Sequence, residues 1–249
     1  ICVVAKVGRF YHTMIIDLAT VRAAHIVLAS GSPRRTDILN NVLKLEARVV
    51  PSTFEEDLDK SRFTPSEYVA ETALQKALDV YRKLSADGSP PSLVVGADTI
   101  VVRDATILEK PKSPDGARAM LCSLSGRQHV VSTAIALVYA ATEADGDPVV
   151  RTFVESTKVN FAMLPPAVID AYIESGEPFD KAGGYGIQGL GGSFVCGIEG
   201  CYWNVVGFPM HRFCVELDCE RLREWVAESA AALATSGLTS GKRPRESQS

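Results

Sequence analysis

The stretch that decides the fold is IVLASGSPRR, residues 26–35. It begins with three apolar residues, which predict a short buried strand, and then continues through the small residues of segment 30–32. Ser32 is a good helix N-cap, and Pro33 suits the first helical position. The stretch therefore predicts a strand, a tight loop and a helix in succession. Apolar spacing gives that helix an inward face formed by Ile38, Leu39, Val42 and Leu43.

Two arginines, Arg34 and Arg35, fall in the first turn of this predicted helix. The positive end of the helix dipole disfavours cations there, at a cost of about 0.3–1 kcal/mol each. A bound anion would offset that cost, because backbone N–H groups and guanidinium groups together suit a phosphate. The alternative is a surface helix start with two solvated arginines, and local chemistry leaves both interpretations open.

Apolar periodicity and turn residues along the rest of the chain predict an α/β protein, with antiparallel pairing of the two longest strands. The helix that begins near residue 64 has a capping box formed by Thr64 and Glu67. The expected strands are 47–50, 93–95, 100–102, 106–108, 130–139, 149–161, 194–198 and 204–206, and the expected helices are 64–84, 113–124, 166–174 and 209–234.

Bulk composition limits the function classes. A length of 249 residues suits one large domain or two small ones. The net charge of −4 offers no general basic surface for nucleic acid, and no apolar run approaches the about 20 residues of a membrane span. We interpret the six scattered cysteines as reduced thiols of a soluble, cytoplasmic protein rather than as a metal site.

Acidic residues at two places could carry chemistry. Asp98 and Thr99 follow an apolar strand, where α/β folds place ligands, although an aspartate there is often only a turn former. The acids of segment 55–57 could hold a hard cation such as Mg²⁺ through oxygen ligands. As a bare charge run, they are more typical of a solvated surface.

A glycine-rich segment, KAGGYGIQG at 181–189, contains a GxGxxG pattern. We reject a dinucleotide site because that motif requires a preceding strand, a following helix and a distant acid. The segment still brings backbone amides close to a partner, beside the cation of Lys181. Gln188 adds a side-chain amide, which can both donate to and accept from a base edge such as that of uracil.

Five motifs in order make the chain similar to the Maf family of nucleoside triphosphate pyrophosphatases. They are ASGSPRR at 29–35, GADT at 96–99, LEKP at 108–111, LSG at 124–126 and FDKAGGYGIQG at 179–189. The resemblance implies an α/β, Maf/inosine-triphosphatase-like fold, with a long mixed sheet flanked by helices and a cleft between two lobes. It also predicts an N-terminal extension over 1–24, a pyrophosphatase domain over 25–234 and a disordered tail over 235–249.

The resemblance also implies roles for individual residues. Asp98 matches the family's catalytic acid, the proton acceptor for water, and Glu56 matches a second acid of the site. Both are expected to take part in catalysis and to bind a divalent cation, Mg²⁺ or Mn²⁺. Arg34, Thr99 and Gln188 match the positions that mark the dTTP/UTP branch of the family. The full set of expected substrate-binding residues is Ser30, Arg34, Arg35, Lys76, Thr99, Lys110, Lys181 and Gln188.

The expected reaction converts dTTP or UTP, with modified pyrimidine nucleotides as further candidates, into the monophosphate and pyrophosphate. One alternative is the same chemistry on a modified purine nucleotide such as 7-methyl-GTP. Another is a division-control protein that binds nucleotides without turnover. Apart from the nucleotide, neither nucleic acid nor a membrane is expected as a partner, and a homodimer is common in such folds.

Overall fold

The computed structural model describes residues 18–88, 90–141 and 146–235. A seven-stranded sheet forms its centre, in the order β2-β1-β3-β5-β6-β7 with β4 beside β3. β1 pairs in parallel with β2 and β3, whereas the remaining pairs are antiparallel. The strands are β1 Ile26–Leu28, β2 Arg48–Val49, β3 Leu93–Arg103, β4 Thr106–Leu108, β5 Gln128–Tyr139, β6 Val149–Phe161 and β7 Val195–Glu199.

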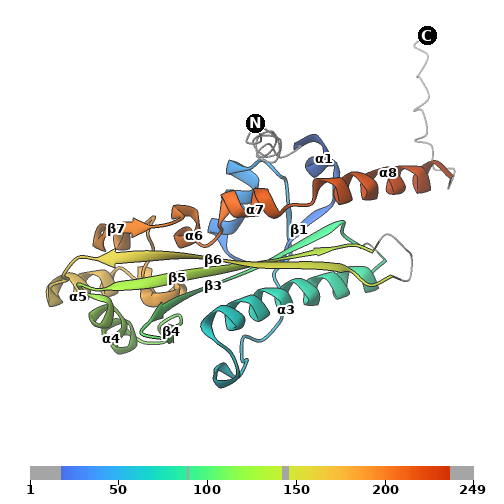
Figure 1. The fold of residues 1–249 in the computed structure, drawn as a ribbon. Helices are drawn as coiled ribbons and strands as arrows, with labels where there is room; N and C mark the ends of the chain where they lie inside the picture. The colour runs from blue at the N-terminus through green and yellow to red at the C-terminus, as the bar shows by residue number, and fades with distance from the viewer. Residues whose placement is uncertain (1–17, 89, 142–145, 236–249) are drawn as a thin grey trace, which may run out of the picture.

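Helices cover both faces of the sheet, as the family resemblance implies (Figure 1). α3 (Pro65–Ala86) lies along one face, with the predicted capping box of Thr64 and Glu67 at its start. α1, α7 and α8 lie on the opposite side, and α4 and α5 lie at one end of the long strands. The other helices are α1 Leu18–Ala23, α2 Pro33–Thr36, α4 Pro114–Leu124, α5 Pro166–Glu174, α6 Tyr202–Val206, α7 Met210–Glu216 and α8 Cys219–Thr235.

Small residues let α3 approach the sheet closely. Ala73 and Ala77 of α3 are fully buried, and so are Ala134 and Ala136 of β5. Gly96 of β3 faces the same helix, and an added Cβ there would collide with the carbonyl oxygen of Ala73. Because this packing is so tight, side chains on the neighbouring turns of α3 are held against the middle of β3.

The helix predicted after Pro33 differs from a regular α-helix. A single α-helical turn passes into a π-helix, Asp37–Val42. The wider π turn rotates the apolar face, so that Ile38 and Leu39 are buried while Val42 is exposed. The expectation that Val42 points inward is therefore wrong.

Three other sequence expectations are corrected by the structure. β3 is one continuous strand, so Asp98 lies within it and not at its end. Segment 204–206 belongs to helix α6, because the buried Asn204 amide turns back to bind the Val131 carbonyl. The helix expected over 209–234 is interrupted where Leu217 takes an extended conformation, between α7 and α8.

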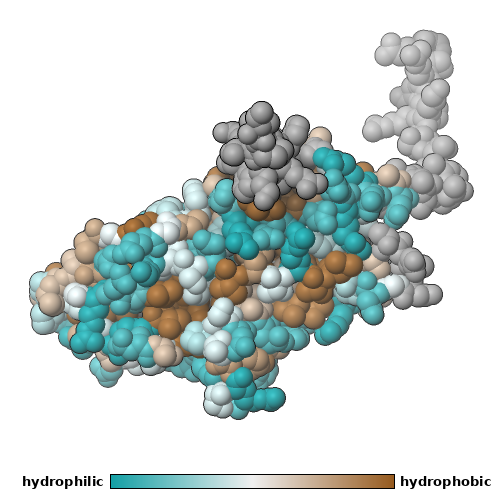
Figure 2. All heavy atoms as spheres, in the orientation of Figure 1, coloured by the Kyte–Doolittle hydropathy of each residue, from teal (hydrophilic) through white to brown (hydrophobic). Residues whose placement is uncertain are grey.

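The predicted extension and tail lie only partly within the described residues. Segments 1–17 and 236–249 are outside them, while α1 contributes the fully buried Val21 to the core. Within the described part of the chain, no helix is long and apolar enough to cross a membrane. On the face seen in Figure 2, hydrophobic side chains gather in patches between hydrophilic ones. The exposed large hydrophobic residues include Val149 and Val150 of β6.

A buried histidine lies at the α4–α5 end of the sheet. Nε2 of His129 lies 2.8 Å from the Tyr185 hydroxyl, and its ring packs edge-on against Phe161. Nδ1 of His129 is buried and has no hydrogen-bond partner among the described residues. Burial lowers the pKa of His129 to about 4, so the folded protein favours the neutral imidazole.

This burial predicts a pH-dependent stability. Above the ordinary pKa near 6.5, His129 is neutral in both the folded and the unfolded protein, and its burial carries no charge penalty. As the pH falls toward 4, the unfolded chain binds a proton that the folded protein does not, so the free energy of unfolding decreases by about 3 kcal/mol. Urea unfolding from pH 7 to pH 4 should show this loss in the wild type. The His129→Phe variant should lose less stability over the same range, and parallel pH profiles for the two proteins would contradict the assignment.

Candidate functional site

One cavity, called the cleft below, has a volume of about 860 Å³ and is built from segments that are far apart in the chain. The loop after β1, the middle of β3, one face of α3 and the glycine-rich segment all contribute to its wall. Every site residue expected from the sequence lines it, namely Ser30, Arg34, Arg35, Glu56, Lys76, Asp98, Thr99, Lys110, Lys181 and Gln188.

Two carboxylates and one lysine form the acidic part of the cleft. The Lys76 ammonium lies 2.7 Å from Oε1 of Glu56 and 2.9 Å from Oδ1 of Asp98. The side chains of Asp98 and Lys76 are about one tenth exposed, whereas that of Glu56 is 47% exposed. Lys76 comes from α3, so the close approach of α3 to Gly96 places this cation beside Asp98.

The surroundings push the pKa values of the two carboxyl groups in opposite directions. Burial raises the pKa of Asp98, although Lys76 and Arg35 oppose that shift. Partial burial also acts to raise the pKa of Glu56, but Lys76 and Lys110 outweigh it, so this pKa lies below its ordinary value. A carboxylate of raised pKa is a better proton acceptor, and one of lowered pKa remains ionised.

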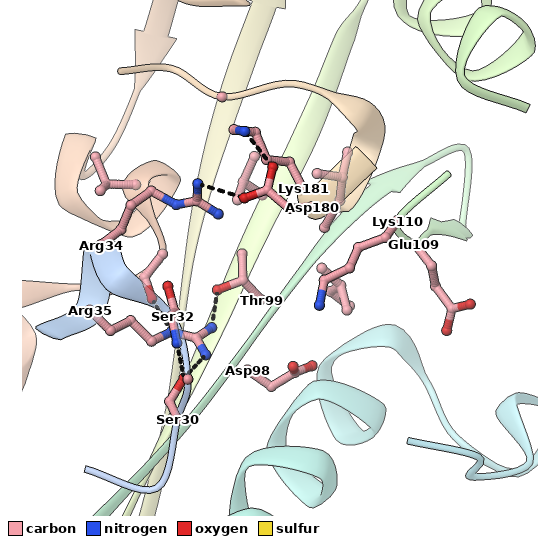
Figure 3. Close-up of a pocket in the computed structure, with 18 of the residues that line it drawn as sticks. Ser30, Ser32, Arg34, Arg35, Asp98, Thr99, Glu109, Lys110, Asp180 and Lys181 are labelled. Atoms are coloured by element: carbon pink, nitrogen blue, oxygen red, sulfur yellow. Dashed lines mark hydrogen bonds and ion pairs between the residues drawn. The ribbon is translucent and has the colours of Figure 1, made fainter. Parts of the chain in front are cut away.

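Cations surround the open part of the cleft (Figure 3). Arg34 and Lys110 extend from opposite sides toward the space between Asp98 and Lys181. The Arg34 guanidinium lies 3.4 Å from Asp180, which also pairs with Lys181. Lys181 donates in addition to the Glu177 carbonyl, at 2.7 Å. The arrangement offers several positive charges to a polyanionic ligand.

Arg35, which was expected to bind substrate, is tied mainly to the protein itself. Its guanidinium donates to the hydroxyls of Ser30 and Thr99, at 3.0 and 2.9 Å. It also donates to the carbonyls of Ala97 and Gly207, at 2.9 and 3.0 Å. Burial lowers the pKa of Arg35, and the charges of Asp98 and Glu56 oppose that shift. Arg35 therefore joins the loop after β1, the middle of β3 and the end of α6.

Thr99 continues this network into the core. Its hydroxyl accepts from Arg35 and lies 2.9 Å from the Thr133 hydroxyl, which in turn donates to the Asn204 carbonyl. Because the single proton of the Thr133 hydroxyl is donated to Asn204, the hydrogen bond between the two threonines is donated by Thr99. Thr99 lines the cleft, but its hydrogen bonds mainly fix the position of Arg35.

The glycine-rich segment is folded around an internal carboxylate, not around an open anion site. Glu177 accepts from the backbone N–H groups of Leu190 and Gly191, at 2.9 and 3.1 Å. The Tyr172 hydroxyl donates to the same carboxylate at 2.9 Å. The rejection of a dinucleotide motif is confirmed, because 3₁₀ turns and not a helix follow the glycines.

Sequence reasoning missed several polar residues of the cleft wall. Glu109 pairs with Lys60 at 2.7 Å and accepts from the Tyr68 hydroxyl at 3.3 Å. Asp180 and Glu177 also line the cleft. Glu109 and Asp180 lie inside the motifs LEKP and FDKAGGYGIQG, so the signal was present, whereas nothing local marks Tyr68 as a cleft residue.

Glu56 and Asp98 are the two carboxylates of the cleft that the family resemblance assigns to a metal ion. No group of three or more His, Cys, Asp or Glu side chains is arranged to hold a metal ion within residues 18–88, 90–141 and 146–235. The cysteines at 122, 196, 201, 214 and 219 are free thiols. A divalent cation would thus depend on Glu56 and Asp98 together with oxygens supplied by a ligand and water.

The fold and the site define an α/β protein with a cation-lined cleft for a polyanion and a pair of carboxylates at its base. The model of the Maf-like protein family matches residues 25–219, and the chain belongs to this family.

Three relatives illustrate the similarity. A human protein named "Probable bifunctional dTTP/UTP pyrophosphatase/methyltransferase protein" is 50% identical over 195 residues, which cover 77% of this chain and only 31% of that protein. A "dTTP/UTP pyrophosphatase" of Clostridium perfringens is 45% identical, with 75% and 92% covered. A protein of the same name from Schizosaccharomyces pombe is 42% identical, with 74% and 79% covered.

The contacts of the two neighbouring arginines predict losses of stability of different size for the same substitution. Arg35→Lys keeps the charge but loses the planar set of donors, so the free energy of unfolding should fall by about 2–4 kcal/mol. Arg34→Lys should change it by less than about 0.5 kcal/mol, because Arg34 has only a partly exposed ion pair. Urea unfolding measures both values, and similar losses for the two variants would refute the structural role of Arg35.

Proposed function

We propose that this protein is a nucleoside triphosphate pyrophosphatase that hydrolyses dTTP and UTP to the monophosphate and pyrophosphate. The observation that carries the proposal is the convergence of the carboxylate pair, the cations Arg34, Lys110 and Lys181, and Gln188 on one cleft. Membership of the Maf family and the names of the relatives support the choice of reaction and nucleotide.

The chemistry proposed for the carboxylates follows from their surroundings. Asp98 accepts a proton from a water molecule, whose oxygen attacks the α-phosphorus. The bond from the α-phosphorus to the bridging oxygen breaks, and pyrophosphate leaves with that oxygen. Lys110, Lys181 and Arg34 offset the charge that develops on the phosphate oxygens, since such reactions depend mostly on positioning and electrostatics.

A divalent cation, Mg²⁺ or Mn²⁺, is part of the proposal. The donor set suits such an ion, because Mg²⁺ is commonly held by one or two carboxylates together with substrate phosphates and water. Glu56 is ionised and half exposed, and Asp98 turns only one oxygen to Lys76. These two residues would hold the ion, which would supply positive charge and lower the pKa of bound water.

Base recognition is assigned to Gln188. This residue lines the cleft and is exposed, and its side-chain amide makes no hydrogen bond within the described part of the chain. A free amide can donate to O4 and accept from N3–H of uracil or thymine. We also propose that the protein is located in the cytoplasm. The absence of nucleic-acid and membrane partners stays a prediction, and so does the homodimer.

The first test concerns Asp98. Pyrophosphate release from UTP and dTTP with Mg²⁺ or Mn²⁺ should be readily measured, and Asp98→Asn should lower kcat by about 100-fold or more. Asp104→Asn, in the exposed turn between β3 and β4, is the matched control and should keep wild-type turnover. If a folded Asp98→Asn variant kept near wild-type turnover, the proposed role of Asp98 as proton acceptor would be wrong.

The metal proposal predicts a difference between two adjacent acids. Glu56→Gln should raise the Mg²⁺ concentration for half-maximal activity by roughly ten-fold or more. Glu55→Gln should leave it unchanged, because Glu55 does not line the cleft. Magnesium titrations of the initial rate compare the two variants, and equal values would argue against Glu56 as a ligand.

A nucleotide panel separates the proposed function from its alternatives. UTP and dTTP should be hydrolysed with higher kcat/KM than GTP or 7-methyl-GTP. Preference for 7-methyl-GTP would favour the modified-purine alternative. Tight UTP binding without pyrophosphate release in the presence of either metal would instead favour a nucleotide-binding protein that has no turnover.

A further inference from the structure

The turn that carries Gln188 is closed by a backbone hydrogen bond from Gly189 to Gly186, at 3.2 Å. Ile187 and Gln188 are the central residues of this turn. The Ile187 side chain packs against the core cluster of β1 and β3, whereas Gln188 is exposed on the cleft wall. The turn therefore presents the Gln188 amide from one defined backbone position.

Glu177 connects this turn to the rest of the molecule. Its two carboxylate oxygens accept from the N–H groups of Leu190 and Gly191, directly after the turn, and from the Tyr172 hydroxyl. Partial burial acts to raise the pKa of Glu177, but these donors keep it below the ordinary value. The carboxylate thus stays ionised and holds the segment at short range.

The glycines of the segment fit this carboxylate closely. A Cβ added at Gly189 would collide with the Glu177 carboxylate, although the backbone of Gly189 is extended and accepts any residue. A Cβ at Gly191 would lie 2.7 Å from the Tyr172 hydroxyl oxygen. Gly189 and Gly191 therefore leave room for Glu177 and its partner, and not for a phosphate.

The position of the turn matters because two base classes share one hydrogen-bonding pattern. Uracil and thymine offer N3–H beside O4, and guanine offers N1–H beside O6. An amide that pairs with one pattern also pairs with the other, so its chemistry alone cannot reject guanine. The purine edge lies farther from the sugar, so discrimination requires a fixed distance between the amide and the cations that hold the phosphates.

We propose that Glu177 is a positioning residue for base specificity, which fixes Gln188 at the distance of a pyrimidine edge from Arg34, Lys110 and Lys181. The inference rests on the proposed function and assigns the selection of pyrimidine over purine triphosphates to an internal carboxylate. Glu177 itself need not touch the nucleotide. Its removal should loosen the turn and admit guanine nucleotides.

The test compares kcat/KM for UTP and GTP in the wild type, Glu177→Ala and Glu177→Gln. The UTP-to-GTP ratio should fall by about ten-fold in Glu177→Ala and less in Glu177→Gln, which keeps one acceptor oxygen. KM for UTP should rise more than kcat falls. The inhibition constant of inorganic tripolyphosphate, which has no base, should change by less than about two-fold. Glu174→Gln, an exposed acid on α5, is the matched control.

A second variant tests the same contact from the other side. Gly189→Ala should displace the Glu177 carboxylate and lower the UTP-to-GTP ratio in the same way. If both act through one contact, the double variant Glu177→Ala/Gly189→Ala should lose no more discrimination than either single variant.

Three results would overturn the proposal. They are an unchanged ratio in Glu177→Ala, a fall in the ratio that is matched by loss of tripolyphosphate binding, and a wild-type protein that does not discriminate UTP from GTP. A wild-type protein that releases no pyrophosphate from any nucleotide would instead overturn the proposed function.

Discussion

The Arg35 guanidinium is the interaction on which the cleft depends. It donates to acceptors in the loop after β1, in the middle of β3 and at the end of α6, three segments that are far apart in the sequence. Its charge also faces Asp98 and Glu56, which oppose the effect of burial on its pKa. A planar group with five donors in fixed directions can satisfy these four acceptors at once, whereas a lysine has only three donors. The motif SGSPRR thus provides one arginine for the scaffold and one, Arg34, whose guanidinium lies in the cleft beside Asp180.

Close packing of α3 produces the second requirement of the site, a lysine placed between two acids. The absence of a side chain at Gly96 brings Ala73 and Ala77 against β3, and Lys76 follows on the same helix. Its ammonium satisfies one oxygen of Asp98 in a place where an unpaired carboxylate would be costly. Packing and catalysis are therefore coupled here, since a larger residue at position 96 would move the cation and change the charge balance of both acids.

Sequence patterns predicted the long elements and the residues of the cleft, but not how each residue is used. The capping box at Thr64, the antiparallel pair β5 and β6 and the helix α5 were predicted because their signals are local. The π-helix after Arg35, the continuous β3 and the helix α6 were missed because they depend on tertiary contacts, such as the buried Asn204 amide. In the same way, sequence placed Arg35 and Thr99 with the ligand, whereas their hydrogen bonds are made within the protein.

The glycine-rich segment illustrates why a pattern of glycines does not identify its partner. Consecutive glycines release backbone N–H groups for an acceptor, and the sequence alone cannot distinguish a bound phosphate from a carboxylate of the same chain. Here the acceptor is Glu177, which lies 13 and 14 residues upstream of the two donors, Leu190 and Gly191. A carboxylate in that place repels an anion from the N–H groups of residues 190 and 191, so the positive charges that the cleft offers to a polyanion are those of Arg34, Lys110 and Lys181. The separation of these cations from the exposed Gln188 amide therefore depends on the position of the Glu177 carboxylate.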